Sequence, residues 1–271
     1  MAMAHVSIDS IRTEHDLEVF IRDHVETNDA YRTVCKGVIK NVSDILKNNI
    51  KGKYRPDEVL KTGSIAKGTA VKGKSDVDLV FVLSRREYQS IDRLYDDLPT
   101  ILNYIKDALN TCPQFRKVRV QPRAVSFQTD CTEPGTGHTH VIDVDILPAV
   151  NFGDGKNEFI IIICSISYLL HQPQLLPCNR LATDIRSIHS QMRGTTTDKR
   201  NLYTPSLTKW QRDFIKKDRT EQLKKLIRFV KYWKNVCVER SPSSFGLELL
   251  IIFLWEKDHK PQFKLTNALR K

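Results

Sequence analysis

Apolar residues near the N-terminus recur at the spacing of an α-helix. Steps of three and four residues place side chains on one helix face, which can then pack against a core. Two such stripes are present: Leu17, Phe20, Ile21 and Val25, then Val34, Val38, Val42, Ile45 and Leu46. Ser10 can cap the first stripe with its hydroxyl. We therefore expect residues 7 to 50 to be helical.

The next hundred residues have the patterns of strands around one helix. The segment Val77 to Leu83, sequence VDLVFVL, is nearly all apolar, which indicates a strand covered on both faces. A strand and a turn are expected at residues 58 to 70, and a helix at residues 91 to 109, where leucine and isoleucine share one stripe. Residues 117 to 128 and 140 to 147 alternate between apolar and polar, as half-buried strands do, and an EPGTG turn separates them.

After Pro148 the pattern changes. Residues 151 to 206 carry clusters of Gly, Pro, Ser and Thr, and their one clear feature is an apolar run at residues 159 to 170. From residue 209 the spacing is helical again, with one stripe formed by Leu223, Leu226, Ile227, Val230, Trp233 and Cys237. A second buried helix, Phe245 to Trp255, follows serines that can cap it. The sequence therefore predicts an α+β fold, with a mixed α/β lobe in residues 1–150 and a helical lobe in residues 151–271.

The charge of the chain favours anionic partners. Its 43 Lys and Arg residues exceed its 32 Asp and Glu residues, so the formal net charge is +11. The apolar run at residues 159 to 170 is shorter than the ~20 residues that span a bilayer, and the N-terminus lacks the apolar core of a secretory signal. We expect no membrane partner and no export.

The cysteines and histidines do not predict a metal site. The six cysteines are widely spread and include no C-x-x-C pair, which argues against a zinc knuckle or a disulfide framework and suits the cytosol or nucleus. His138 and His140 lie in a Gly-rich turn with no cysteine or carboxylate cluster near them, so a solvated loop is expected there.

The segment from Lys61 to Leu83, KTGSIAKGTAVKGKSDVDLVFVL, contains the residue types that phosphoryl transfer needs. Asp76 and Asp78 are two apart, so on a strand both carboxylates point to one face and can bind divalent metal. Metal ions held in this way activate an attacking hydroxyl and stabilise a leaving pyrophosphate. Gly63 lets backbone amides approach a triphosphate closely, and Ser64 adds a hydroxyl donor.

A bare D-x-D sequence more often caps a strand or lies in a solvated loop. Three further features favour the metal site here. The Gly-Ser turn precedes the aspartates at close spacing, an apolar strand follows them at once, and a second acidic strand supplies Asp143 and Asp145 on one face. A two-metal site usually requires a third carboxylate, which a neighbouring strand can place beside the first pair.

The stretch GSIAKGTAVKGKSDVDLVFVL resembles the signature of the 2'-5'-oligoadenylate synthetases, within the polymerase-beta-like nucleotidyltransferase superfamily. VDILPAV is similar to that family's third-aspartate strand, which favours Asp145 over Asp143 as the third metal ligand. The segments TKWQRDFIKKDRTEQLKKLIRFVKYWKNVC and SPSSFGLELLIIFLWEK resemble the family's helical lobe. The similarity covers most of residues 58 to 150 and 204 to 256.

The resemblance implies a bilobal nucleotidyltransferase with a mixed-sheet N-lobe and a helical C-lobe. The family continues through further helices after the position of Lys271, so the helical lobe is expected to be incomplete. Residues 159 to 194 resemble nothing in the family and are expected to be an insertion.

The resemblance also implies site residues. Asp76, Asp78 and Asp145 would bind two Mg²⁺ ions, with ATP as the substrate. Gly63 and Ser64 would hold the donor triphosphate.

Two pairs in the helical lobe are expected to complete the nucleotide site. Arg228 and Lys231 would contact nucleotide phosphates, because they lie three apart beside the apolar stripe and can face a cleft; a solvated helix face is the alternative. Ser244 and Phe245 stand where family members have Gln-Tyr, which leaves the nucleobase contact open and is similar to the Ser-Ser-Tyr of cyclic GMP-AMP synthase relatives.

The family is activated by double-stranded RNA, and the matching positions are Lys61, Lys67, Arg212 and Lys216. Independently, residues 209 to 240 hold eleven basic and four acidic side chains, and residues 61 to 74 hold four lysines and no acid. Such a surface suits the phosphates of duplex RNA, whereas a merely solvated basic surface is the alternative.

The sequence therefore predicts an RNA-activated synthetase of 2'-5'-linked oligoadenylates, which acts in innate antiviral sensing. A cyclic-dinucleotide synthase is one alternative. The missing Cys/His zinc insertion argues against the closest such enzyme, but not against its zinc-free relatives. A catalytically silent RNA-binding module is the other, although the presence of all three aspartates argues against it.

Overall fold

The computed structural model describes residues 11–73, 76–133, 135, 137–152, 188, 190–216, 219–238, 243–257 and 262–269. Two compact units make up the chain. The sheet unit comprises residues 28–67 and 76–217, and the helical unit comprises residues 1–27, 68–75 and 218–271.

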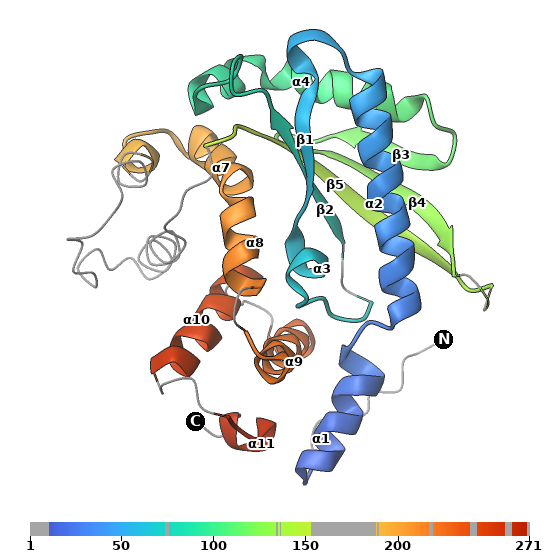
Figure 1. Cartoon of the computed structure of the whole chain (residues 1–271), viewed down its shortest axis with the longest axis vertical. Coiled ribbons are helices and arrows are strands. Elements are labelled where there is room, and N and C mark those ends of the chain that lie inside the picture. The colour runs from blue at the N-terminus through green and yellow to red at the C-terminus, as the bar shows by residue number, and fades with distance from the viewer. Residues whose placement is uncertain are drawn as a thin grey trace. The chain divides into compact units, whose positions relative to one another are not determined.

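The sheet unit is built on five strands in the order β1-β2-β5-β4-β3 (Figure 1). The strands are β1 Pro56–Lys61, β2 Val77–Leu83, β3 Phe115–Val120, β4 Val125–Thr132 and β5 Thr139–Ala149. β2 and β5 are parallel, and the other neighbours are antiparallel. The sheet is therefore mixed, and the predicted α+β class is confirmed.

Two long helices cover one face of this sheet. They are α2, Asp29–Asn49, and α4, Ile91–Asn110. Their apolar stripes share a core with Leu79 and Phe81 of β2 and with Val144 and Ile146 of β5. Because side chains alternate along a strand, the intervening residues of β2 and β5 point to the opposite face. That face carries Asp78 and Asp145.

The opposite face has its own apolar part. Val80 and Val82 of β2 pack there with Leu60 of β1 and Ala149 of β5. β2 is thus apolar on both faces after its first two residues, as the run VDLVFVL predicted. Asp78 stands just before this apolar part and is half-buried.

Two of the described helices beyond residue 150 belong to the sheet unit. They are α7, Thr197–Ser206, and α8, Thr208–Lys216. Leu202 and Trp210 from these helices are buried in the same core as the strands. The sequence placed one boundary near residue 150, whereas the units divide the chain at several positions, because α7 and α8 complete the core of the sheet. The short helix α3, Gly63–Lys67, and the turn η3, Gly52–Tyr54, also lie in this unit.

Two expectations from the sequence are wrong, one for residues 117 to 128 and one for His140. Residues 117 to 128 form parts of two strands, because the chain turns between them and the Gln121 amide donates to the Ala124 carbonyl at 2.8 Å. Pro122 in this turn has no amide hydrogen to donate to a strand ladder. His140 was expected in a solvated loop, but it lies on β5 and is partly buried, with its Nε2 2.8 Å from Glu133 Oε1. The apolar run at residues 159 to 170 lies outside the described residues.

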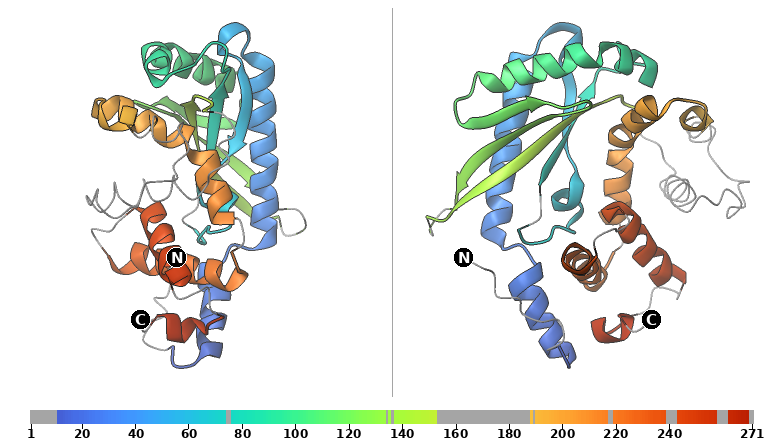
Figure 2. Two further views of the ribbon diagram at one scale, coloured as in Figure 1. Left: turned by 60° about the vertical axis from the view of Figure 1, so that its left-hand side comes forward. Right: turned by 180° about the vertical axis from the view of Figure 1, so that it is seen from behind.

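The helical unit has a separate core. Its elements are α1 Glu14–Phe20, the π-helical turn η2 Ile21–Val25, α9 Glu221–Cys237, α10 Ser244–Lys257 and α11 Leu265–Ala268 (Figure 2). Leu17 and Phe20 pack with Phe229 of α9 and Leu265 of α11. Glu14 accepts hydrogen bonds from the Leu265 and Thr266 amides, which holds the start of α11 against α1. Among the described helices, none is long and apolar enough to cross a membrane.

The buried face of α9 differs from the predicted stripe. Leu223, Leu226 and Ile227 are buried as expected, but Trp233 is 44% exposed and Cys237 is exposed. Arg228 and Lys231 are buried instead. A pattern of apolar residues alone does not identify these positions, because their burial depends on polar partners supplied by distant parts of the chain.

Candidate active site

Asp78 and Asp145 lie side by side on neighbouring strands. They are direct register partners in the parallel pair of β2 and β5. Neighbouring strands are about 4.8 Å apart, so two carboxylates on one face at the same register level can share a cation. Asp76 precedes β2 by one residue and is exposed. The sheet thus brings together the two aspartates that lie 67 positions apart in the sequence.

Gly63 packs directly against Asp78. Its φ of +67° lies in the left-handed region that side chains disfavour. A methyl group built on Gly63 would lie 2.0 Å from Asp78 Oδ2. The preceding residue, Thr62, is also fixed to this strand, since its amide and its hydroxyl both donate to the Asp78 carbonyl, at 2.9 and 3.2 Å. The glycine at this position therefore leaves space for the Asp78 carboxylate.

The donor set suits a hard divalent cation, because it consists of carboxylate oxygens in adjacent positions. In the described part of the chain, no three His, Cys, Asp or Glu side chains are gathered closely enough to hold a metal ion. The register pair of Asp78 and Asp145 supplies two of the carboxylates that such an ion needs. Asp143, the other acidic residue of β5, is the register partner of Gln128 on β4, and Gln128 Nε2 donates to its carboxylate at 2.8 Å. This arrangement agrees with Asp145 as the better ligand candidate.

Tyr31 at the start of α2 was missed by sequence reasoning. Burial raises the pKa of its phenol, and the nearby Cys35 thiol and the carboxylates of Asp76 and Asp143 add to the shift. A phenol is protonated at physiological pH and can donate a hydrogen bond, and the raised pKa keeps it protonated at more alkaline pH as well. Its ring also contacts His140 edge-on, with centroids 5.1 Å apart. No motif signals this residue, since it reaches the acidic strands only through the packing of α2.

Arg228 and Lys231 have a role in this structure that the sequence did not predict. The Arg228 guanidinium donates to the Gly68 carbonyl at 2.7 Å and pairs with Glu26 and Glu221. Lys231 Nζ donates to the Thr69 carbonyl at 3.0 Å and pairs with Glu248 at 3.1 Å.

The burial of these cations excludes the solvated helix face as their environment. Arg228 is 3% exposed and Lys231 is 6% exposed, and Glu248 is also buried. The Thr69 hydroxyl donates to Glu248 at 2.6 Å, which completes the cluster. Both cations therefore fix residues 68 and 69, which follow the Gly-Ser turn in the chain. Contact with nucleotide phosphates stays a prediction for both residues.

Ser244 and Phe245 stand at the start of α10 and are partly buried. Ser243 caps this helix, because its hydroxyl accepts from the Gly246 amide at 3.0 Å. Lys234 of α9 lies 3.5 Å from the Ser244 hydroxyl. The capping serine is confirmed, whereas a nucleobase contact by Ser244 and Phe245 stays a prediction.

Three of the four predicted RNA-contacting residues lie close together in the sheet unit. Arg212 of α8 donates to the Lys61 carbonyl at the end of β1. Burial, followed by the charges of Lys36 and Lys216, lowers the pKa of Lys61, so Lys36 on α2 joins the group. The fourth residue, Lys67, is buried. We name Lys36, Lys61, Arg212 and Lys216 the basic cluster.

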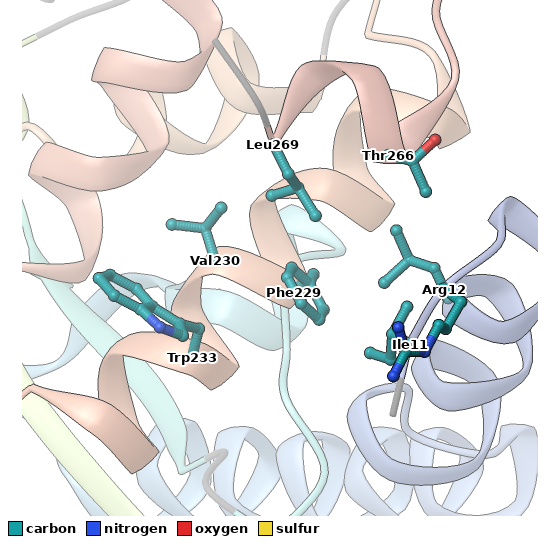
Figure 3. A pocket seen from close by; sticks show the side chains of 8 residues that line it. Ile11, Arg12, Phe229, Val230, Trp233, Thr266 and Leu269 are labelled. Carbon is teal, nitrogen blue, oxygen red and sulfur yellow. The ribbon is translucent and has the colours of Figure 1, made fainter. Parts of the chain in front are cut away.

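The helical unit contains an open cavity of a different character (Figure 3). Its lining is mainly apolar, with Arg12 as its charged side chain. The lining residues are Ile11, Arg12, Leu17, Phe229, Val230, Trp233, Thr266 and Leu269. No carboxylate lines it, so it lacks the ligands that a metal–triphosphate complex needs. The candidate active site is therefore the acidic face of the sheet.

Two family models match the chain on either side of its middle. The model described as nucleotidyltransferase domain matches residues 39–131, which include Gly63, Ser64, Asp76 and Asp78. The model described as 2'-5'-oligoadenylate synthetase 1, domain 2, C-terminus matches residues 185–271. The C-terminal third of the chain is therefore similar to the 2'-5'-oligoadenylate synthetase family, and an earlier third is similar to nucleotidyltransferase domains.

Curated relatives of this family align along most of the chain. 2'-5'-Oligoadenylate synthase 3 of Mus musculus is 29% identical over 94% of this chain and 21% of the relative. 2'-5'-Oligoadenylate synthase 1A of Mus musculus is 29% identical over 89% of this chain and 63% of the relative. The chain thus spans about a fifth of the first relative and less than two thirds of the second. The resemblance found in the sequence is confirmed.

Two solved structures have a similar fold. The STING-associated CdnE c-di-GMP synthase from Capnocytophaga granulosa is 18% identical, with a TM-score of 0.55 over 96% of this chain and 73% of that chain. The CdnC:HORMA-deltaN complex of E. coli MS115-1 is 20% identical, with a TM-score of 0.50 over 93% of this chain and 67% of that chain. At this identity the likeness concerns the nucleotidyltransferase fold alone.

Proposed function

We propose that this chain is a nucleotidyltransferase that makes 2'-5'-linked oligoadenylates from ATP, with double-stranded RNA as its activator. The observation that carries the proposal is the register pairing of Asp78 with Asp145 on β2 and β5, with Gly63 packed behind Asp78. Similarity to the oligoadenylate synthetases and to nucleotidyltransferase domains supports the same chemistry. In a cell, the activity would serve antiviral sensing in the cytoplasm.

The three aspartates are assigned to two Mg²⁺ ions. Asp76, Asp78 and Asp145 would hold them, and the ions, when bound, would activate the attacking hydroxyl and stabilise the leaving pyrophosphate. Asp145 is the group proposed to assist removal of the proton from the 2'-hydroxyl. Gly63 and Ser64 would bind the donor triphosphate through close backbone approach and the serine hydroxyl.

The basic cluster is proposed to bind the phosphates of duplex RNA. The basic cluster is formed by three elements, α2, β1 and α8, which supply Lys36, Lys61, Arg212 and Lys216. Proteins recognise duplex RNA largely through its shape and its phosphate backbone, which such a basic surface can contact. Burial is the larger cause of the lowered pKa of Lys61, and repulsion by the charges of Lys36 and Lys216 adds to it. A bound polyanion would relieve that repulsion. Lys67 is the weaker candidate, because it is buried.

Product analysis tests the activity. The 271-residue chain is incubated with radiolabelled ATP or GTP, Mg²⁺ and duplex RNA, and the product is digested with a nuclease specific for 3'-5' linkages. We expect oligoadenylates that resist the nuclease and that form only when RNA is present. Complete digestion of the product, or a cyclic dinucleotide as the product, would refute the 2'-5' assignment. Absence of product from a folded chain that binds RNA would favour the silent RNA-binding module.

Charge reversal tests the RNA surface. Lys216→Glu and Arg212→Glu should weaken duplex RNA binding, and wild-type affinity should fall steeply with salt, because each neutralised phosphate releases counterions. Arg123→Glu is the matched control, since Arg123 is exposed in the β3–β4 turn, at the sheet edge opposite β1. Equal losses in the control and the cluster variants would mean that net charge, and no defined surface, determines binding.

A further inference from the structure

Asp145 has one partner on each side. Its register partner on β2 is Asp78, and its register partner on β4 is Ser126. The Ser126 hydroxyl donates to Asp145 Oδ1. A second carboxylate thus lies on one flank of Asp145, and a hydrogen-bond donor lies on the other.

A hydrogen-bond relay fixes the direction of this contact. A carboxylate only accepts hydrogen bonds, so the single proton of the Ser126 hydroxyl points at Asp145. The Ser126 oxygen can then accept, and Gln121 Nε2 donates to it at 2.9 Å. Gln121 is itself held at the β3–β4 turn, where its amide donates to the Ala124 carbonyl. The relay therefore runs from Gln121 through Ser126 to Asp145.

The relay opposes the repulsion between the two aspartates. Without a cation, the carboxylates of Asp78 and Asp145 repel each other, which favours side-chain rotations that separate them. A bond that holds Oδ1 on the β4 side removes this freedom and leaves Oδ2 for the β2 side. Partners of this kind orient metal ligands, and their loss typically weakens metal affinity by about 10- to 100-fold.

We propose that Ser126 is a positioning residue that holds the Asp145 carboxylate in the orientation needed to bind metal beside Asp78. The inference rests on the proposed function, in which Asp145 is a metal ligand. Ser126 acts through Asp145 and touches no reacting atom. Nothing in the residue type alone marks it, because its partner is set by the register of β4 and β5.

Metal binding without turnover tests the inference. Mn²⁺ is titrated into the chain with saturating α,β-methylene-ATP, in which carbon replaces the oxygen of the bond that would break, and free Mn²⁺ is counted by electron paramagnetic resonance. Ser126→Ala should weaken Mn²⁺ binding by about 10- to 100-fold. Ser126→Thr keeps the hydroxyl on a strand-compatible side chain and should restore binding to within about threefold. Gln121→Ala, at an exposed position, should cause a smaller loss in the same direction.

Gln128→Ala is the matched control. Gln128 lies on the same face of β4 and donates to the carboxylate of Asp143, its register partner, which the proposed site does not use. This variant should bind Mn²⁺ as the wild type does. In turnover assays, Ser126→Ala should raise the metal concentration needed for half-maximal rate, while KM for ATP at saturating metal stays unchanged.

Asp145→Ala distinguishes a failure of the positioning role of Ser126 from a failure of the proposed metal site. If Asp145→Ala loses Mn²⁺ binding while folded Ser126→Ala keeps it, the positioning role is wrong and the proposed site stands. If Asp145→Ala also binds Mn²⁺ normally, both the site and the positioning role are wrong. If Ser126→Ala and Ser126→Thr lose binding equally, the hydroxyl is not the cause and the positioning role fails.

Discussion

Gly63→Ala tests whether the site depends on the close packing behind Asp78. Gly63 has a φ of +67°, and a side chain in this conformation costs about 1–2 kcal/mol. The added methyl group would also lie 2.0 Å from Asp78 Oδ2. The oxygen must retreat by about 1.4 Å to reach 3.4 Å, where ordinary contact begins.

The two costs have different consequences. The backbone cost acts on stability, and for a chain of this size it lowers Tm by roughly 2–8 °C. The displacement acts on the carboxylate, which can rotate away at little further cost in stability but then leaves its place beside Asp145. A misplacement of about 1 Å in a catalytic group lowers the rate on the order of 10²-fold. We expect the activity of Gly63→Ala to fall by that factor.

Gly52→Ala is the control for the backbone cost. Gly52 has a φ of +64°, and a methyl group there meets nothing within 4 Å. Both variants are compared by thermal unfolding and by RNA-activated ATP turnover. They should share a similar loss of Tm, while only Gly63→Ala loses activity.

A double-mutant cycle in stability isolates the clash. The Asp78→Ala background lacks the carboxylate. In it, Gly63→Ala should lower the free energy of unfolding by about as much as Gly52→Ala does. The exception is the remaining tight approach of 3.1 Å to the Cβ atom of residue 78. If Gly63→Ala keeps activity within about threefold of Gly52→Ala, the position of the Asp78 carboxylate does not limit the reaction, and our reasoning from its geometry is wrong.

Other perturbations test separate parts of the structure. Asp76→Ala or Asp78→Ala should abolish magnesium-dependent turnover while circular dichroism shows an intact fold, and near-normal activity in either would remove it from the metal site. Burial and the nearby charges lower the pKa of Lys61. At pH values below that pKa, the charged lysine therefore destabilises the folded state. Lys61→Met should therefore raise Tm near pH 7, and the gain should shrink as the pH approaches 10.5, the unfolded value; a gain independent of pH would exclude charge as its cause. Glu248→Ala leaves Lys231 buried without its carboxylate and should cost about 3–5 kcal/mol in denaturant unfolding, whereas a loss below about 1 kcal/mol would show that water replaces the partner.

The strands and helices of the core follow from the sequence, because they repeat simple periods. The run from Val77 to Leu83 has the composition of a strand buried on both faces, and the structure confirms it. The split between β3 and β4 could also have been predicted, since Pro122 interrupts the ladder. Residues on each side of the turn alternate between apolar and polar, which masked this signal. The apolar positions nevertheless change from even numbers (Val118 and Val120) to odd numbers (Val125 and Phe127) across the turn.

The partners within the candidate site do not follow from the sequence. Asp76 and Asp78 are adjacent to a strand signal, and Asp145 lies on a second acidic strand, so their type and spacing are visible. The pairing of Asp78 with Asp145 cannot be predicted in this way, since a shift of one residue between β2 and β5 would turn one of the carboxylates to the other face. Ser126 is still less visible, because it depends on a second register, that of β4 with β5.

Arg228 and Lys231 are predicted to contact nucleotide phosphates, and in this structure they donate to backbone carbonyls. Residues 68–73 connect the Gly-Ser turn to Asp76, and the two cations hold the start of this connection by donating to the carbonyls of Gly68 and Thr69. A phosphate oxygen is a stronger acceptor for a cation than a neutral carbonyl, so a nucleotide could replace these bonds. The exchange would release the carbonyls from buried donors, and they would need other partners. If these cations do bind nucleotide, binding therefore has to be coupled to a rearrangement of the backbone at Gly68 and Thr69.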